Sequence, residues 1–518
     1  MVLAIWVVGG ETCPMQGKSS PERQMLDAAA FCRGLVEEGS IYAFLADHRS
    51  ELFKDGDFAD LFPSGRGRPS TPAALICSVM VLQALEGLSD RDAIRQLRTR
   101  IDWKVACGLA LDDPGFDFTN LTYWRGKLRR SQRPERIFDA VRHVVEQTGV
   151  LARKTRRALD STILDDAVAT QDTVTQIISA VRRVKEAVPG LADVELVHDY
   201  AVIGKPVINW SDKHERDGVV SVLVNDAVTL LQAASSLTLD DAQADLVGML
   251  ALVSAQDVEP GEAEGSWRIA RRVAKDRIIS VVDPEARHGH KSVAVRKDGF
   301  KAHLAIEPDT GIITAAAITP ANAPDGPAGL VLMEGEAPTE VLADSAYGSG
   351  AVRRSLRDKD HRLVIKPMPS HPAVPGGFVR DDFVVDHAGR TVTCPAGHTK
   401  ALNRKGTAKF SPHCESCELR AACTTARFRS FSVGEYDEEL VAARAAWRDA
   451  EVHATYRRHR PMAERSLAWL VAKNNRRLRY RGVVRNEQWL LVRAAVLNLR
   501  RLLALGLSFE ETWRISSA

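Results

Sequence analysis

Residues 299–318 constrain the fold most, because two strand patterns there flank a short turn. From 299 to 306 apolar and polar residues alternate with a period of two, as in a strand with one buried face. Asp309-Thr310-Gly311 has the composition of a hairpin turn, and the apolar residues 312–318 fit the returning strand. The sequence therefore predicts an antiparallel hairpin here.

Three more apolar runs have the length of strands, at 159–164, 341–344 and 363–366, and a short helix fits 327–334. A hairpin followed by strands that a helix separates indicates a mixed sheet. The predicted fold class is α/β, or mixed α+β. This order is compatible with a ribonuclease-H-like sheet that a helical insertion interrupts, although periodicity alone does not prove it.

Two other parts of the chain have helical patterns. Residues 26–150 contain several, among them a capped helix at 123–128 that ends in Arg129 and Arg130. Short helices followed by a basic helix could dock into a DNA groove, but the same pattern fits a plain helical bundle. Amphipathic helices also follow the first strand and predict a helical insertion at about 166–275.

Length and charge give broad limits. With 518 residues the chain has room for three or four domains, and its net charge of +3 says little about partners. Residues 456–501, however, contain thirteen Lys or Arg and two Glu. A local basic face of this kind is typical of a polyanion-binding surface, and the alternative is a solvated helix surface.

The first residues and the scattered cysteines indicate a protein of the reducing cytosol. Residues 2–10 are apolar but lack a basic leader, so we expect no signal peptide and interpret 1–25 as a disordered extension, with Met15 or Met25 as alternative starts. We expect no membrane span, since no apolar run reaches about 20 residues. Eight cysteines are present, and they do not form a disulfide framework.

The last four cysteines form a different pattern. Cys394-Pro-Ala-Gly-His398 resembles one knuckle of a zinc ribbon, Cys414 and Cys417 form a CxxC, and Cys423 follows. Residues 376–430 have few large apolar side chains and need some staple to fold. We therefore predict a structural zinc held by the four cysteines, with His398 as a possible substitute ligand; free cysteines in a loop are the alternative.

Three acidic residues suit a shared metal site. Asp160 lies within the first strand, Asp344 ends a later strand, and Glu464 is expected in the first turn of a helix that Pro461 opens. Carboxylate oxygens are the ligands that Mg²⁺ and Mn²⁺ prefer, and two such ions about 3.5–4 Å apart promote phosphodiester cleavage. Other carboxylates compete by position, namely Asp165, Asp166 and Asp283, although the first two are expected to cap the next helix.

Basic residues near Glu464 could bind DNA phosphates. Arg460 and Lys473 are placed to neutralise non-bridging phosphate oxygens, and a basic loop follows them. The predicted DNA-binding residues of that loop are Arg476, Arg477, Arg479 and Arg481. From spacing alone the three acids remain one choice among several.

The ordered motifs resemble those of bacterial insertion-sequence transposases of the DDE class. They are Leu-Asp160-Ser-Thr-Ile-Leu, Asp-Gly-Phe-Lys-Ala-His303, Ile-Thr-Pro-Ala-Asn322, Leu-Ala-Asp344-Ser-Ala-Tyr-Gly, Arg460-x3-Glu464, and Arg479-Tyr-Arg-Gly482 followed by Val-Leu-Asn498-Leu. The resemblance covers nearly all of the chain after residue 30. It implies a ribonuclease-H-like catalytic domain in which Asp160, Asp344 and Glu464 form the metal-binding triad. The role of Tyr456 stays open.

This resemblance implies an enzyme that uses two Mg²⁺ or Mn²⁺ ions to cut the ends of its element and join them to target DNA. Expected partners are the terminal inverted repeats, target DNA and a second copy of the chain, in the nucleoid-containing cytoplasm. A non-catalytic DNA-binding regulator and a nuclease that does not join strands are the alternatives. The predicted domains are a helical DNA-binding domain at 26–150, a catalytic domain at 151–375 and 431–518, and the cysteine-rich insert at 376–430.

Overall fold

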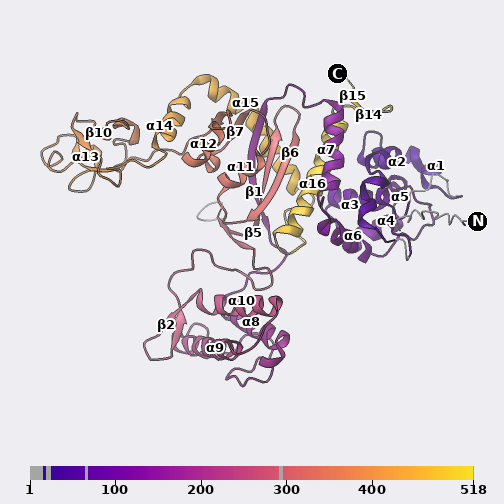
Figure 1. Cartoon of the computed structure of the whole chain (residues 1–518), viewed down its shortest axis with the longest axis horizontal. Coiled ribbons are helices and arrows are strands. Elements are labelled where there is room, and N and C mark those ends of the chain that lie inside the picture. The colour runs from indigo at the N-terminus through magenta and orange to yellow at the C-terminus, as the bar shows by residue number, and fades with distance from the viewer. Residues whose placement is uncertain (1–15, 19–24, 65–67, 291–295, 517–518) are drawn as a thin grey trace, which may run out of the picture.

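The computed structural model describes residues 16–18, 25–64, 68–290 and 296–516. A sheet occupies the middle of the molecule, with the N-terminal helices on one side and the cysteine-rich segment at the opposite end (Figure 1). The helical insertion projects from the sheet as a separate lobe. Most of the predicted extension 1–25 lies outside the described residues; within it, the buried Gln16 amide donates to the Asp55 carbonyl at 2.7 Å.

The N-terminal part is helical, as predicted, and is built around α3 (Ala73–Glu86), which is buried along nearly its whole length. A helix that is apolar on every side needs neighbours on every side. The neighbours of α3 include α2 (Ile41–Leu52), α4 (Asp90–Thr99), α5 (Ile101–Cys107) and α6 (Thr119–Arg130). The short α1 (Ala28–Cys32) and α7 (Arg136–Thr148) complete the N-terminal helices.

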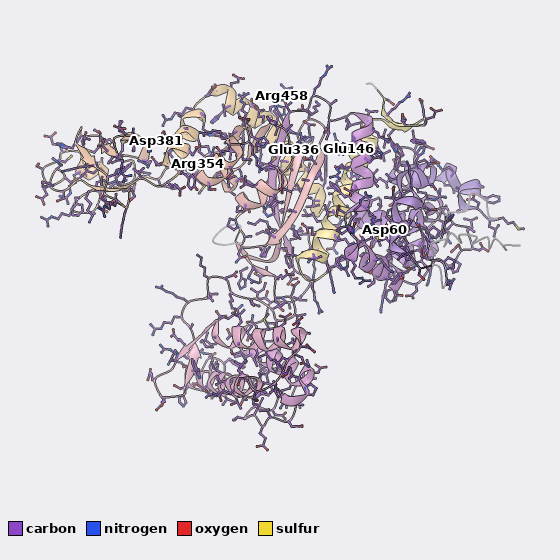
Figure 2. All side chains as sticks on the ribbon, in the orientation of Figure 1. Asp60, Glu146, Glu336, Arg354, Asp381 and Arg458 are labelled. Atoms are coloured by element: carbon purple, nitrogen blue, oxygen red, sulfur yellow. The ribbon has the colours of Figure 1, made fainter. Side chains whose placement is uncertain are left out.

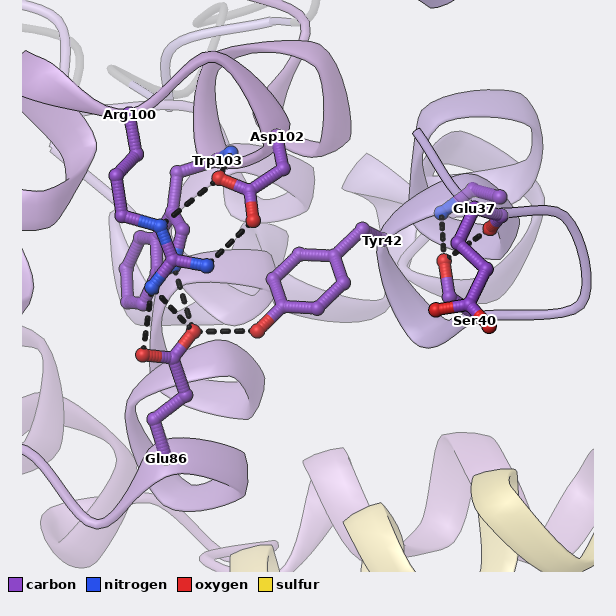
Figure 3. Close-up of polar contacts among 8 residues, drawn as sticks. Glu37, Ser40, Tyr42, Glu86, Arg100, Asp102 and Trp103 are labelled. Atoms are coloured by element: carbon purple, nitrogen blue, oxygen red, sulfur yellow. Dashed lines mark hydrogen bonds and ion pairs between the residues drawn. The ribbon is translucent and has the colours of Figure 1, made fainter. Parts of the chain in front are cut away.

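A polar cluster fixes the end of α3. The Glu86 carboxylate accepts hydrogen bonds from the Tyr42 hydroxyl, from the Trp103 indole at 2.9 Å and from Arg100 at 2.8 Å (Figure 3). Arg100 also pairs with Asp102. One carboxylate thereby joins α2, α3 and α5 and sets the direction in which the chain leaves α3.

The central sheet is mixed, which confirms the predicted fold class. Its strands lie in the order β6, β5, β1, β7, β8, and β4 pairs with the first part of β5. β1 is antiparallel to β5 and parallel to β7, and β7 is parallel to β8. The strands are β1 (Arg156–Asp165), β4 (Arg287–His290), β5 (Arg296–Glu307), β6 (Ile312–Pro320), β7 (Glu340–Ala343) and β8 (Arg362–Ile365).

The predicted hairpin is β5 and β6, whose turn is held by one carboxylate. Glu307 accepts hydrogen bonds from the backbone N–H groups of Asp309 and Thr310, at 3.1 and 2.8 Å. Gly311 has a φ of +74°, a conformation that glycine adopts without a Cβ clash.

Helices cover both faces of the sheet. Alternate strand residues point to opposite faces, so Leu159 and Val341 pack on one side and Ala158 and Leu342 on the other. The first face is covered by α11 (Asp325–Leu332) and α12 (Gly350–Arg357). The second is covered by α15 (Ala450–Val471) and α16 (Val483–Ala504), and through them by the N-terminal helices.

The insertion after β1 has its own hydrophobic core. It comprises α8 (Thr173–Ala187), α9 (Lys213–Ala234), α10 (Asp241–Ala255) and a hairpin absent from the sequence prediction, β2 (Val258–Pro260) with β3 (Trp267–Ile269). Within the described residues α9 is long and apolar enough to cross a membrane by composition alone. Its Leu223 and Leu230 are fully buried in the core of the insertion, against α8 and α10.

The remaining elements follow β8. The cysteine-rich segment contains short strands from β9 (Val384–Asp386) to β13 (Ser430–Ser432), and α14 (Asp437–Ala446) leads back to the sheet. The prediction that Pro461 opens a new helix is wrong, because α15 continues through it and Glu464 lies in mid-helix. An internal proline costs about 3 kcal/mol; burial of Ala463 and Leu470 on the core side of α15 offsets that cost.

Candidate active site

Strand register places Asp160 and Asp344 side by side. β1 and β7 are parallel, and Leu159 pairs with Ala343. The residue that follows each member of this pair is an aspartate, Asp160 or Asp344. Neighbouring strands lie about 5 Å apart, and residues in register point to the same face. Asp344 also caps the short 3-10 helix Ser345–Tyr347, where its Oδ1 accepts a hydrogen bond from the N–H of Ala346 at 3.0 Å.

Helix α15 brings three further side chains to this place. Tyr456, Arg460 and Glu464 are spaced four residues apart, so they lie on one face of the helix, about one turn from each other. The electrostatic surroundings of Tyr456 include Arg460 and all three predicted acids. Burial raises the pKa of the Tyr456 hydroxyl, and the carboxylates of Asp344, Asp160 and Glu464 raise it further.

Arg460 lies between the two aspartates. Its Nη2 is 2.7 Å from Oδ1 of Asp160 and 3.9 Å from Oδ2 of Asp344, and its Nη1 donates to the carbonyl of Leu159. The Arg460 and Asp160 side chains are buried, whereas the Asp344 side chain is 41% exposed. The site is therefore closed at Asp160 and opens toward solvent at Asp344.

Burial and charge act in opposite directions on Asp160. Burial raises the pKa of its carboxyl group and the neighbouring Asp344 adds to this effect, while Arg460 and the Ser161 N–H counteract it. A buried carboxylate without a cation would be costly, so the guanidinium keeps the pair of aspartates together.

The donor set suits a hard divalent cation. Asp160, Asp344 and Glu464 offer carboxylate oxygens, which Mg²⁺ and Mn²⁺ prefer. In the described part of the chain, no three His, Cys, Asp or Glu side chains lie close enough together to hold a metal ion as they stand. Glu464 is exposed on α15, and Arg460 lies where a cation would neutralise the aspartates.

A second polar layer lies on the other face of β1 and was not predicted. Ser161, next to Asp160, donates to Asp325 at 2.9 Å, and Asp325 also pairs with Lys301. His303 is fully buried between Tyr347 and Thr319, and burial lowers its pKa to about 4, so its ring is neutral at pH 7. Lys301 and His303 belong to the motif Phe-Lys-Ala-His, and this motif was the only sequence feature that could have indicated the polar layer.

The competing carboxylates lie elsewhere. Asp165 pairs with Lys297 at 3.0 Å, and Asp166 lies against Asp283. The prediction that Asp165 and Asp166 cap the next helix is wrong, because Asp172 is the N-cap of α8 and accepts from the N–H of Thr175. β1 ends at Asp165 and α8 begins at Thr173, so several residues connect the sheet to the insertion before the helix is capped.

Two family models match this chain. A family model described as Transposase DDE domain matches residues 267–499, and one described as Transposase domain (DUF772) matches residues 33–127. The chain belongs to the DDE transposases of insertion sequences. Searches of curated proteins and of solved structures gave no significant match. In this transposase the region 267–499 contains Asp344 and Glu464, whereas Asp160 lies before it.

The basic residues of the transposase fall into two groups. Arg476 donates to the Ile163 carbonyl at 2.9 Å, and Arg479 donates to the Gly87 carbonyl, so both hold the loop against its neighbours. Lys473, Arg477 and Arg481 are exposed. On α6, Arg125 is paired with Asp90 at 2.8 Å inside the protein, whereas Arg130 at the end of the helix is exposed.

The four late cysteines meet in the cysteine-rich segment. Cys394, Cys414, Cys417 and Cys423 line one small cavity together with His398 and His413, whose rings are stacked. Burial raises the pKa of the Cys423 thiol, and the other three cysteines raise it further. As with the acids, the described thiols stand too far apart to hold an ion without rearrangement.

Proposed function

We propose that this transposase cleaves DNA at the ends of its insertion sequence and joins the new 3′ ends to target DNA. The observation that carries the proposal is the placement of Asp160 and Asp344 at adjacent positions of parallel strands, with a buried guanidinium between them. The strand order and directions support a ribonuclease-H-like catalytic domain.

Asp160, Asp344 and Glu464 would hold two Mg²⁺ or Mn²⁺ ions. When bound, the ions activate an attacking water or 3′-hydroxyl and stabilise the leaving oxygen. Asp160 would hold them from the buried side of the site, and Asp344 and Glu464 would hold them from the side that opens toward solvent. Asp344 now accepts a hydrogen bond from the N–H of Ala346 and Glu464 is exposed, so both side chains would have to reorient to hold an ion.

The surrounding residues position the substrate. Lys473, Arg477 and Arg481 extend from the loop 473–482 and would bind phosphates of the DNA backbone without reading sequence. Arg476 and Arg479 would hold that loop in place. The neutral His303 and its partners would support β1 beneath Asp160, because Ser161 pairs with His303 across the strands.

The cysteine-rich segment would bind one structural zinc through Cys394, Cys414, Cys417 and Cys423. Thiolates are preferred zinc ligands, and four of them close a tetrahedral site. Their shared cavity supports this assignment. Such a site leaves no open coordination position and would stabilise the segment, not take part in the reaction.

Substitution of the acids tests the reaction. Asp160→Asn, Asp344→Asn and Glu464→Gln should each lower strand cleavage at least 1,000-fold in Mg²⁺, because each removes a charged metal ligand. DNA binding measured without divalent metal should change less than threefold, and Glu262→Gln, exposed in the insertion, is the control. If any of the three variants cleaves like wild type, that residue does not belong to the triad.

The products of the same assay decide between functions. Joined strands support a transposase that completes the reaction, whereas nicked DNA alone would indicate a nuclease. Binding without products would indicate a regulator. We expect the active species to be an oligomer in which two copies hold two DNA ends, acting in the cytoplasm on the nucleoid.

A further inference from the structure

Arg460 is a permanent cation in the place where the proposed metal ions would be needed. The guanidinium stays protonated at any pH that proteins tolerate. It contacts Asp160 at 2.7 Å, reaches toward Asp344 at 3.9 Å and donates to the carbonyl of Leu159. With 6% of its surface exposed, Arg460 interacts through protein and little through water.

We propose that Arg460 is a positioning residue that competes with divalent cations for Asp160, and that a DNA phosphate releases it. Metal loading and DNA binding are then coupled through this one side chain. The inference rests on the proposed function, since it takes Asp160 and Asp344 as metal ligands.

The charge of Arg460 acts directly on the proposed metal site. Charges in a buried site are screened far less than charges on the surface, so a guanidinium beside Asp160 opposes the approach of a second cation. Without any cation, the buried Asp160 next to Asp344 would be unpaired and destabilising. Arg460 therefore stabilises the metal-free protein and weakens metal binding through the same contact.

The guanidinium of Arg460 can also bind phosphate. Phosphate is the other anion that arginine binds with paired hydrogen bonds, and DNA supplies it. The site opens toward solvent at Asp344, whose side chain is 41% exposed, and at the exposed Glu464 one turn from Arg460. A phosphate on that side would attract Arg460 outward and leave Asp160 to the metal. Linkage then requires that metal also strengthens DNA binding by the same factor.

Metal binding without DNA tests the competition. Titration with Mn²⁺, followed by electron paramagnetic resonance, should show Arg460→Gln binding about tenfold more tightly than wild type. Arg460→Lys keeps the charge and should stay within about threefold of wild type. Arg458→Gln removes an exposed arginine from the same helix (labelled in Figure 2) and should have no effect. If Arg460→Gln does not fold, Arg460→Met preserves the buried stem and carries the same expectation.

DNA binding tests the coupling. Fluorescence anisotropy with a short duplex, at constant ionic strength, should show about tenfold tighter binding of wild type when Ca²⁺ is added. The Arg460→Gln variant should gain less than twofold, because its metal site no longer depends on phosphate. Equal gains in the two proteins would overturn the coupling.

The outcomes separate this inference from the proposed function. If Asp160→Asn loses Mn²⁺ binding while Arg460→Gln binds no more tightly than wild type, the competition is wrong and the proposed metal site stands. If Asp160→Asn and Asp344→Asn both bind Mn²⁺ like wild type, the proposed site is wrong, and the role of Arg460 falls with it.

Discussion

Single carboxylates in this transposase differ mainly in their nearest neighbour. Asp160 lies against a guanidinium, whereas Asp166 lies against a second buried carboxyl group, that of Asp283. Burial raises the pKa of Asp283, and hydrogen bonds from the N–H of Gly482 to both of its oxygens, at 3.0 and 3.2 Å, counteract that shift. Burial and the Asp283 charge raise the pKa of Asp166 to about 6. A proton on Asp166 relieves the repulsion between these two carboxyl groups, which lie where the end of β1 meets the loop 473–482.

The Asp166 carboxyl predicts a pH effect on stability. Its pKa is about 6 in the folded chain and near 3.8 when unfolded, so the folded state holds the extra proton between these values. Stability from this group is therefore present at about pH 4 and is lost as the pH rises through 6. Asp166→Asn should shift the urea midpoint upward at pH 7, relative to wild type, and should shift it clearly less at pH 4.5.

The control for this measurement is Asp193→Asn, an exposed aspartate of the insertion. It should leave the pH dependence of the urea midpoint as in wild type. If Asp166→Asn kept the wild-type pH dependence of the urea midpoint, protonation of Asp166 would not contribute to stability.

At the scale of the elements, the end of α3 ties the N-terminal helices to the C-terminal part of the chain. The Ala84 carbonyl accepts from Arg493 of α16 at 2.7 Å, and Asn475 donates to it at 3.4 Å. The Gly87 carbonyl accepts from Arg479. Orphan carbonyls at a helix end need partners, and here the basic loop and α16 supply them. The N-terminal domain thus positions the loop that we propose to bind DNA.

Gly87 allows this close approach. It has a φ of +67°, and a Cβ there would lie 2.0 Å from the Lys473 carbonyl oxygen. Gly87→Ala should therefore cost clearly more than the ~1–2 kcal/mol of a left-handed alanine, and it should weaken duplex binding as the loop moves. The measurements are urea unfolding and fluorescence anisotropy.

Gly149→Ala is the matched control. Gly149 has a φ of +61° and nothing within 4 Å of the added Cβ, so it isolates the backbone term. Equal losses of stability in the two variants would mean that contact with Lys473 does not hold the loop.

At the scale of the whole molecule, separate hydrophobic cores stabilise different parts of the chain. The N-terminal helices and one face of the sheet share a core, the insertion has its own, and the cysteine-rich segment has a third. That third core is small and lies at the far end of the molecule from the N-terminal helices (Figure 1). A segment with so small a core depends on additional cross-links.

Removal of the proposed zinc should therefore unfold one part only. The purified protein should contain about one zinc per chain, and chelation should expose residues 376–430 to protease while the rest stays intact. Cys417→Ser should lose the zinc, whereas Cys32→Ser, in the N-terminal helices, should retain it. Stoichiometric zinc in both variants would exclude the four-cysteine site.

Much of the fold was readable because local patterns are strong there. The alternation in β5, the turn before β6 and the apolar β7 all follow from residues close in sequence. The position of Asp344 at the end of a strand was predicted for the same reason, although β7 itself stops one residue earlier. Continuation of α15 through Pro461 was not, because packing of the surrounding helix, and not local preference, decides it.

The sequence by itself determined which acids and bases are present, where the strands and helices with strong local patterns form, and that the chain resembles transposases. Only the tertiary structure decided that Asp160 and Asp344 are neighbours, that Arg460 lies between them and that Arg125 is internal. Strand pairing joins residues far apart in the chain, and burial determines which charges must be paired. Neither depends on the identity of nearby residues alone, which is why sequence patterns could name the acids but could not place their counter-ion.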